Sequence, residues 1–137
     1  MADLSPTAAN VLKASSRSVT RVGTAGAAIT AGDVLYGSTS ELLLAQADTS
    51  AKATAVGIAL CDAAKGQPVV YLVSGGINPG ATVTVGEYYV VSSNAAGKMA
   101  PLSDLTQDDY VTGLGFATKA SNIDIDINVT GVQVPGA

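Results

Sequence analysis

Few residues of this 137-residue chain could carry out chemistry, and the strongest pair is Asp124 and Asp126. Carboxylates at alternate strand positions point to one side of a sheet, where they could share a cation or act as acid and base. The segment 123–129, however, alternates Ile or Val with Asp and Asn, which is typical of a half-buried strand. We therefore predict that the isoleucines point inward and that both carboxylates face water.

The other candidates for catalytic or metal-binding residues also have simpler structural interpretations. Cys61 is the only cysteine and the chain has no histidine, so a nucleophile would lack its usual base and no Cys/His zinc site can form. Asp108 and Asp109 suit a turn and lack the spacing of a calcium loop. Gly75–Gly76 lacks the Lys-Ser/Thr ending of a phosphate loop. We predict no catalytic residue, no metal and no cofactor, and we do not expect an enzyme.

Three tyrosines could stack on sugars or on nucleic-acid bases: Tyr71, Tyr88 and Tyr89. All three lie in runs of β-branched residues, where a tyrosine ring usually packs in a core or an interface. The sequence pattern therefore favours a packing role for them.

Composition and charge exclude several classes of function. Charged residues make up only 13% of the chain and apolar residues 47%, which suits a surface covered by a partner or by further copies of the chain. A net charge of -4 argues against nucleic-acid binding. No apolar run approaches the ~18 residues that span a bilayer, and no signal-peptide profile is present. We expect synthesis in a cytoplasm and no membrane role.

The stretch 55–76 is the centre of the expected β-structure. An apolar run at 55–61 and a β-branched run at 69–73 flank a polar break, which predicts two strands joined by a turn. Gly75–Gly76 is expected to end the second strand. Pro79–Gly80 then suits a type II turn, because Pro fixes φ and Gly accepts a positive φ.

The body of the chain contains an internal repeat. Three landmarks recur in the same order: 29–35 with 83–89, 56–60 with 112–116, and 69–75 with 125–131. The first landmark contains an expected turn of glycine and an acidic residue in each unit, Gly32–Asp33 and Gly86–Glu87. Neither unit can bury a face alone, so the two are expected to pair. The predicted fold is all-β: a small β-barrel or sandwich at 27–137, built from two pseudo-repeated β units at about 27–76 and 81–132, with an extended N-terminal arm at 1–26.

The alignment of the two units also assigns counterparts. It matches Gly57 with Gly113 and Cys61 with Ala117, as expected if the cysteine is a small buried filler. Gly57 and Ala59 lie on the small-residue side of their strand, and this side is the expected seam between the units.

The N-terminal arm, residues 1–26, has a composition unlike that of the body. It carries Lys13, Arg17 and Arg21 against a single acidic residue, whereas the remainder of the chain is acidic. A short helix and an extended arm both remain open, and such segments order mainly on a partner. Its candidate partner-contacting residues are these three cations with Val11 and Leu12.

The order of segments ITAGDVLY, AVGIALCDAAKGQPVVYLVSGG, GATVTVGEYYV and IDIDINVTG resembles the capsid decoration, or head cement, proteins of tailed bacteriophages. The most specific part is V-G-I-A-L-x-D-A-x-x-G-x-P-V at 56–69, and the likeness covers roughly 20–132. It implies a structural virion protein that binds the outside of an assembled capsid and bridges capsomers. The implied partners are the major capsid protein and further copies of the chain, as a trimer or a dimer, with no nucleic acid or membrane. The implied location is the capsid exterior, after assembly in the bacterial host cytoplasm.

Two other hypotheses stay open. A carbohydrate- or receptor-binding module associated with a phage tail or head fibre would suit the tyrosines and the repeated β unit. A small metal-dependent hydrolase would require Asp124 and Asp126 to converge with further carboxylates.

Overall fold

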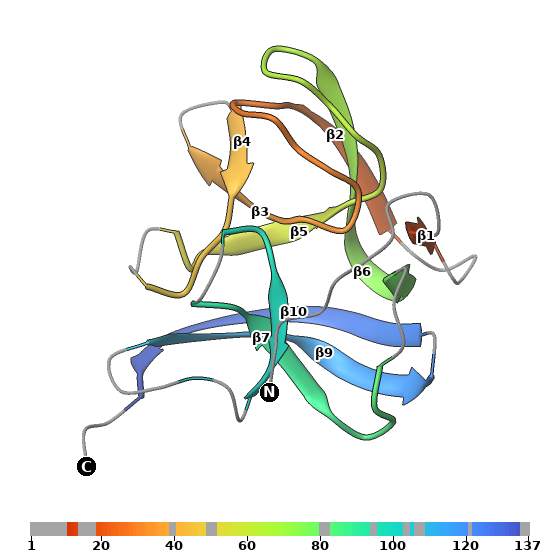
Figure 1. The fold of residues 1–137 in the computed structure, drawn as a ribbon, viewed down its shortest axis with the longest axis vertical. Helices are drawn as coiled ribbons and strands as arrows, with labels where there is room; N and C mark the ends of the chain where they lie inside the picture. The colour runs from red at the N-terminus through yellow and green to blue at the C-terminus, as the bar shows by residue number, and fades with distance from the viewer. Residues whose placement is uncertain are drawn as a thin grey trace.

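The computed structural model describes residues 11–13, 19–38, 41–48, 52–79, 83–93, 96–102, 105, 109–120 and 122–134. Within these ranges the chain forms an antiparallel sheet that curls into a half-barrel (Figure 1), and they contain no α-helix. The predicted all-β fold class is therefore confirmed. The strands are β1 (Val11–Lys13), β2 (Val19–Thr24), β3 (Val34–Ser38), β4 (Glu41–Leu44), β5 (Ala55–Ala59), β6 (Pro68–Pro79), β7 (Tyr88–Val91), β8 (Met99–Pro101), β9 (Tyr110–Lys119) and β10 (Asn122–Gln133).

The sheet consists of two units with the same strand plan. Its order is β4-β3-β5-β6-β10-β9-β7-β8, so the first unit (β3 to β6) is mirrored by the second (β7 to β10), with β6 and β10 adjacent at the centre. In Figure 1, β2 to β5 gather in the upper half, β7, β9 and β10 in the lower half, and β6 runs between them. The predicted construction from two repeated β units is confirmed.

The Gly-acid turn that marks each unit adopts the same conformation twice. Gly32 and Gly86 both have positive φ, at 96° and 86°, which favours glycine because a side chain would clash with the backbone. The Gly32 N–H donates to the Ala59 carbonyl over 2.8 Å, and the Gly86 N–H donates to the Ala117 carbonyl over the same distance. Each turn therefore ties the start of its unit to the end of β5 or β9.

These bonds correct the alignment of the two units. Ala117 is the counterpart of Ala59, not of Cys61. Strand pairing also changes the counterpart of Gly57: it pairs with Leu35 as Gly115 pairs with Tyr89. Gly57 therefore corresponds to Gly115 and not to Gly113. A register shift follows each of these pairs, so both units carry the same bulge. The β6 and β10 registers likewise pair Tyr71 with Ala59 and Ile123 with Ala117, so Tyr71 corresponds to Ile123, not to Ile127.

Strand β6 is longer than its sequence indicates. The expected end at Gly75–Gly76 is wrong, since the strand continues to Pro79; Gly80 of the expected Pro79–Gly80 turn lies outside the described residues. Gly75 has a φ of 101° and pairs with Ile125, so its backbone bends within the strand instead of ending it. Ile77 is fully buried and pairs with both Lys13 and Ile123. Burial and pairing on both edges outweigh the local turn preference of glycine and proline.

The central core lies between the two units. Its fully buried members come from both units and include Ile58, Leu72, Leu114 and Ile123. A second cluster lies within the first unit and contains Ala25, Ile29, Leu35, Leu42, Ala59, Ala63 and Val69. Two apolar layers therefore cover opposite sides of the first unit.

The expected seam at Gly57 and Ala59 is wrong. Ala59 faces the second cluster, and the central core receives Ala55 and Ile58 from this strand. A Cβ on Gly57 would lie 2.6 Å from the Leu72 carbonyl oxygen and against the Tyr71 ring. Gly57 therefore allows β6 of its own unit to approach closely, rather than the other unit.

Replacing either bulge glycine with alanine tests this packing. A Cβ on Gly115 would overlap the Asp124 carbonyl, so Gly57→Ala and Gly115→Ala should each lower the free energy of unfolding by about 2 kcal/mol. Gly37→Ala is the matched control, since no atom lies within 4 Å of its Cβ position, and it should change stability by less than about 0.5 kcal/mol. Urea denaturation followed by circular dichroism measures all three, and a Gly115→Ala protein as stable as the control would contradict the assignment.

Candidate ligand-binding surface

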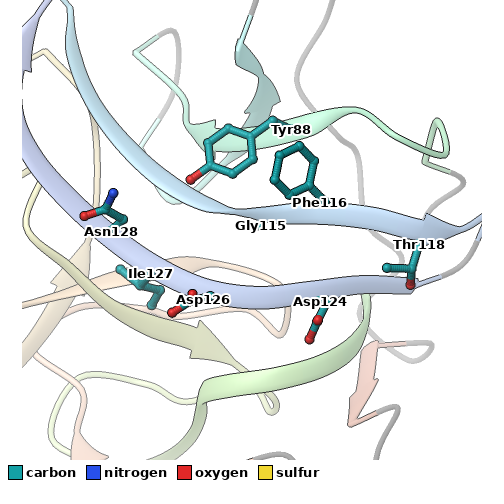
Figure 2. A pocket seen from close by; sticks show the side chains of 8 residues that line it. All are labelled: Tyr88, Gly115, Phe116, Thr118, Asp124, Asp126, Ile127 and Asn128. Atoms are coloured by element: carbon teal, nitrogen blue, oxygen red, sulfur yellow. The ribbon is translucent and has the colours of Figure 1, made fainter.

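A broad depression of about 620 Å³ lies on the outer side of the β9-β10 hairpin (Figure 2). Strand β7 contributes one aromatic residue to its lining, and β9 and β10 contribute the other residues, of which Ile127 also packs against the central core. The lining residues are Tyr88, Gly115, Phe116, Thr118, Asp124, Asp126, Ile127 and Asn128. We call this region the outer depression.

An aromatic pair forms one side of the outer depression. Tyr88 and Phe116 lie opposite each other across β7 and β9, with ring centroids 4.6 Å apart and planes tilted by 56°. Both rings lie over the same side of β9 (Figure 2), and Phe116 is 55% exposed. A tilted pair of this kind holds both rings in place while part of the Phe116 surface remains open to solvent.

The other side of the outer depression is polar. Asp124 and Asp126 are exposed, and Ile123 and Ile125 between them are buried, so the predicted solvated face of this strand is confirmed. The alternation ends after Asp126, because a register shift between Ile125 and Asn128 leaves Ile127 half-buried. Two carboxylates and one amide are thereby placed beside the aromatic pair.

A second depression of about 540 Å³ adjoins the first one, because both are lined by Asp126 and Ile127. Its other lining residues come from β2, β5, β6 and β10: Arg21, Ala55, Val56, Tyr71, Val73, Ser74 and Val129. We refer to the two depressions together as the groove; Phe116 and Tyr88 line the first depression, and Tyr71 lines the second.

The candidate contact residues of the N-terminal arm fall in different places. Val11, Leu12 and Lys13 form β1 beside the end of β6, and Arg17 lies outside the described residues. Arg21 is exposed on β2, opposite Tyr71 of β6. Strand β2 belongs to the sheet along its whole length, so the sheet begins within the segment assigned to the arm.

The remaining candidates from the sequence have structural partners. Cys61 is half-buried, and its sulfur accepts a hydrogen bond from the Val70 N–H at 3.4 Å. Asp109 accepts one from the Ser93 hydroxyl at 2.7 Å, and Asp108 lies outside the described residues. Tyr89 is buried and its hydroxyl accepts from the Thr84 N–H. Of the three tyrosines only Tyr89 is a core residue, whereas Tyr71 and Tyr88 line the groove.

No metal centre or membrane-spanning helix is found in the part of the chain that the structure describes. There, no three or more His, Cys, Asp or Glu residues come together as metal ligands. Those residues also form no helix long and apolar enough to cross a bilayer.

The residues of the site that sequence reasoning missed are Phe116, Thr118 and Asn128. The near-continuous apolar run around Phe116 has no period that distinguishes its inner from its outer side. Phe116 pairs directly with Asp124 across β9 and β10, so both side chains point to the same side of the sheet. Only this pairing with a polar residue could have indicated that Phe116 is exposed.

Comparison of the sequence with protein-family models gave no match, and no curated protein matched the sequence.

One buried carboxylate lies away from the groove, where the two units meet. Asp33 is 6% exposed and accepts a hydrogen bond from the Thr30 N–H at 2.9 Å. Lys98 of the second unit approaches it at 3.8 Å. Burial raises the pKa of the Asp33 carboxyl above its ordinary value of 3.8, although the Thr30 hydrogen bond and the Lys98 charge oppose the rise.

This raised pKa makes stability depend on pH in a defined direction. The folded state binds the Asp33 proton more tightly than the unfolded state. The contribution of Asp33 to the free energy of unfolding therefore falls as the pH rises from below 3.8, the ordinary pKa, through the raised pKa of the folded state. Asp33→Asn keeps an acceptor for Thr30 and removes the titration. Relative to the natural protein, the variant should therefore gain stability as pH rises through this window. Urea denaturation across the window measures the difference, and a difference that is independent of pH would contradict the expectation.

Proposed function

We propose that this protein is a structural component of a phage particle that binds the outer surface of the assembled capsid and bridges capsomers. The sequence resemblance to head cement proteins and the low charge of the chain support this proposal. Its partners would be the major capsid protein and further copies of the chain, as a trimer or a dimer. The proposal includes no catalytic step.

The observation that carries the proposal is the exposed apolar strand β2. Val22 is 67% exposed and lies opposite Val70 of β6, which is 37% exposed, while Val19 is 46% exposed. Among the described strands, β2 pairs with β6 alone. Exposed valines on an edge strand favour contact with another protein, because apolar burial and free backbone groups then act together.

Arg21 is the only cation of this strand and lies in sequence between its two exposed valines, Val19 and Val22. A capsid exterior that is acidic at the contact would attract Arg21. The same exterior would repel the remainder of the chain, because that part is itself acidic. We therefore place the proposed contact on β2 and not on the acidic outer depression.

Cosedimentation with undecorated capsid shells tests the contact. Val22→Glu places a charge in the proposed contact and should weaken binding at least about tenfold. Val85→Glu is the matched control, because Val85 is 61% exposed in the turn before β7, and it should bind as the natural protein does. Circular dichroism verifies that both variants are folded. Natural protein that stays in the supernatant, or equal binding by both variants, would contradict the proposal.

A truncation tests the segment before β2. Deletion of residues 1–18 removes β1 and its pairing with the end of β6 but leaves β2 and its pairing with β6 intact, so the body should still fold as a β-protein. Capsid binding should weaken if this segment orders on the shell, as its composition predicts. Shell binding equal to that of the full chain would show that residues 1–18 take no part in the contact.

A further inference from the structure

One row of side chains has a different environment in each unit. In the first unit, Val34, Ile58 and Leu72 lie in register across β3, β5 and β6, and all three are fully buried. In the second unit the same row consists of Tyr88, Phe116 and Asp124 across β7, β9 and β10. Burial does not explain why this outer row carries two aromatic rings next to a carboxylate, because Phe116 and Asp124 face solvent.

The chemistry of this row matches that of a sugar ring. A pyranose has an apolar face of C–H groups and a rim of hydroxyls, so it is bound by an aromatic surface with hydrogen-bond acceptors beside it. Phe116 offers the aromatic surface, and the Tyr88 ring packs against it with the ring centroids 4.6 Å apart. Asp124, Asp126 and Asn128 lie on the neighbouring strand and supply acceptors for hydroxyl donors (Figure 2).

We propose that the outer depression binds an uncharged oligosaccharide, with one sugar ring stacked on Phe116 and its hydroxyls donating to Asp124 and Asp126. This role goes beyond capsid attachment and does not depend on it. The charge of the site selects the ligand class, because the lining of the outer depression contains two carboxylates and no Lys or Arg. An acidic sugar or a phosphate would be repelled there.

The adjoining second depression extends the ligand beyond one sugar. The two depressions meet at Asp126 and Ile127, and the second one contains Tyr71, Ser74 and Arg21. A further sugar placed there would again meet an aromatic ring and hydrogen-bonding groups, now including the Arg21 donors. The groove therefore fits a chain of at least two sugars.

The backbone around the outer depression argues against a peptide strand as its ligand. Strand β9 pairs with β7 and β10, and β10 pairs with β9 and β6, so Phe116 and Asp124 both lie between paired neighbours. A peptide could not extend the sheet at these residues, and it would lose the main-chain hydrogen bonds that such recognition depends on. A sugar needs only side-chain groups.

Heteronuclear NMR on the full ¹⁵N-labelled chain tests the proposal with three defined trisaccharides: maltotriose and tri-N-acetylchitotriose, which are uncharged, and 3′-sialyllactose, which is anionic. At least one uncharged trisaccharide should shift the amide signals of Phe116, Asp124 and Asp126 and saturate at millimolar concentration. The anionic sugar should leave the signals of Phe116 and Asp124 unshifted, because these two residues line only the outer depression, which contains no Lys or Arg.

Variants identify the groups responsible. Phe116→Ala should weaken the binding about tenfold, and Asp126→Asn should weaken it less, since asparagine retains one acceptor oxygen. Val85→Ala alters an equally exposed apolar side chain outside the lining and should leave binding unchanged. Phe116 is exposed, so its variant should fold, and its far-ultraviolet spectrum verifies this.

Three outcomes would overturn the proposal. The first is the absence of shifts with either uncharged trisaccharide up to about 20 mM, and the second is binding that survives Phe116→Ala. The third is shifts of the same amide signals when the protein alone is concentrated, which would assign the face to contact between copies of the chain. Failure of capsid cosedimentation has no bearing on these measurements, so the two proposals fail separately.

Discussion

The antiparallel pairing of β6 with β10 is the interaction on which the rest of the structure depends. It pairs residues 74–77 of β6 with residues 123–126 of β10, running in the opposite direction, and so joins the two units in one sheet. Ser74 and Asp126 occupy equivalent positions in the two units and pair with each other, so the local two-fold axis passes between them. The pairing requires β6 to continue through Gly75, whose φ of 101° favours glycine over residues with a side chain.

A second junction holds the units together away from this axis. The Ala47 N–H donates to the Ser92 carbonyl at 3.0 Å, and the Tyr110 N–H donates to the Ala47 carbonyl at 2.8 Å. The Thr112 hydroxyl, itself buried, donates to the Ala53 carbonyl. With the units joined at both places, the central core is enclosed between them, and Asp33 with Lys98 lies across the same boundary.

Enclosing the core in this way gives two similar units different exposed surfaces. The same row of side chains faces the core in the first unit and faces outward in the second. It therefore consists of aliphatic residues in the first unit and of Tyr88, Phe116 and Asp124 in the second. The second unit thereby supplies the outer depression, while β2, which lies outside the repeated plan and pairs with β6 of the first unit, carries the exposed valines of the proposed capsid contact. The two proposed binding surfaces therefore lie on different parts of the sheet.

Several features followed from the sequence because local chemistry determines them. Glycine before an acidic residue predicted both turns, and alternation of isoleucine with aspartate predicted which side of β10 is buried. The repeat of strand order was visible for the same reason, since each landmark is a local pattern. The counterparts within the repeat were not, because a slip of two or four residues leaves every side chain on the same face of its strand. This is why Gly57 was matched to Gly113 instead of Gly115, and Tyr71 to Ile127 instead of Ile123.

The sequence by itself determined the all-β class, the two-unit plan, the Gly-acid turns and the solvated carboxylates of β10. Tertiary structure alone decided the length of β6, the membership of β2 in the sheet and the exposure of Phe116. Each of these depends on which strands lie beside a segment, and neighbouring strands come from residues far away along the chain. The preference of a single residue for or against a strand is only about 1 kcal/mol. Strand pairing and burial against residues far away along the chain outweigh it.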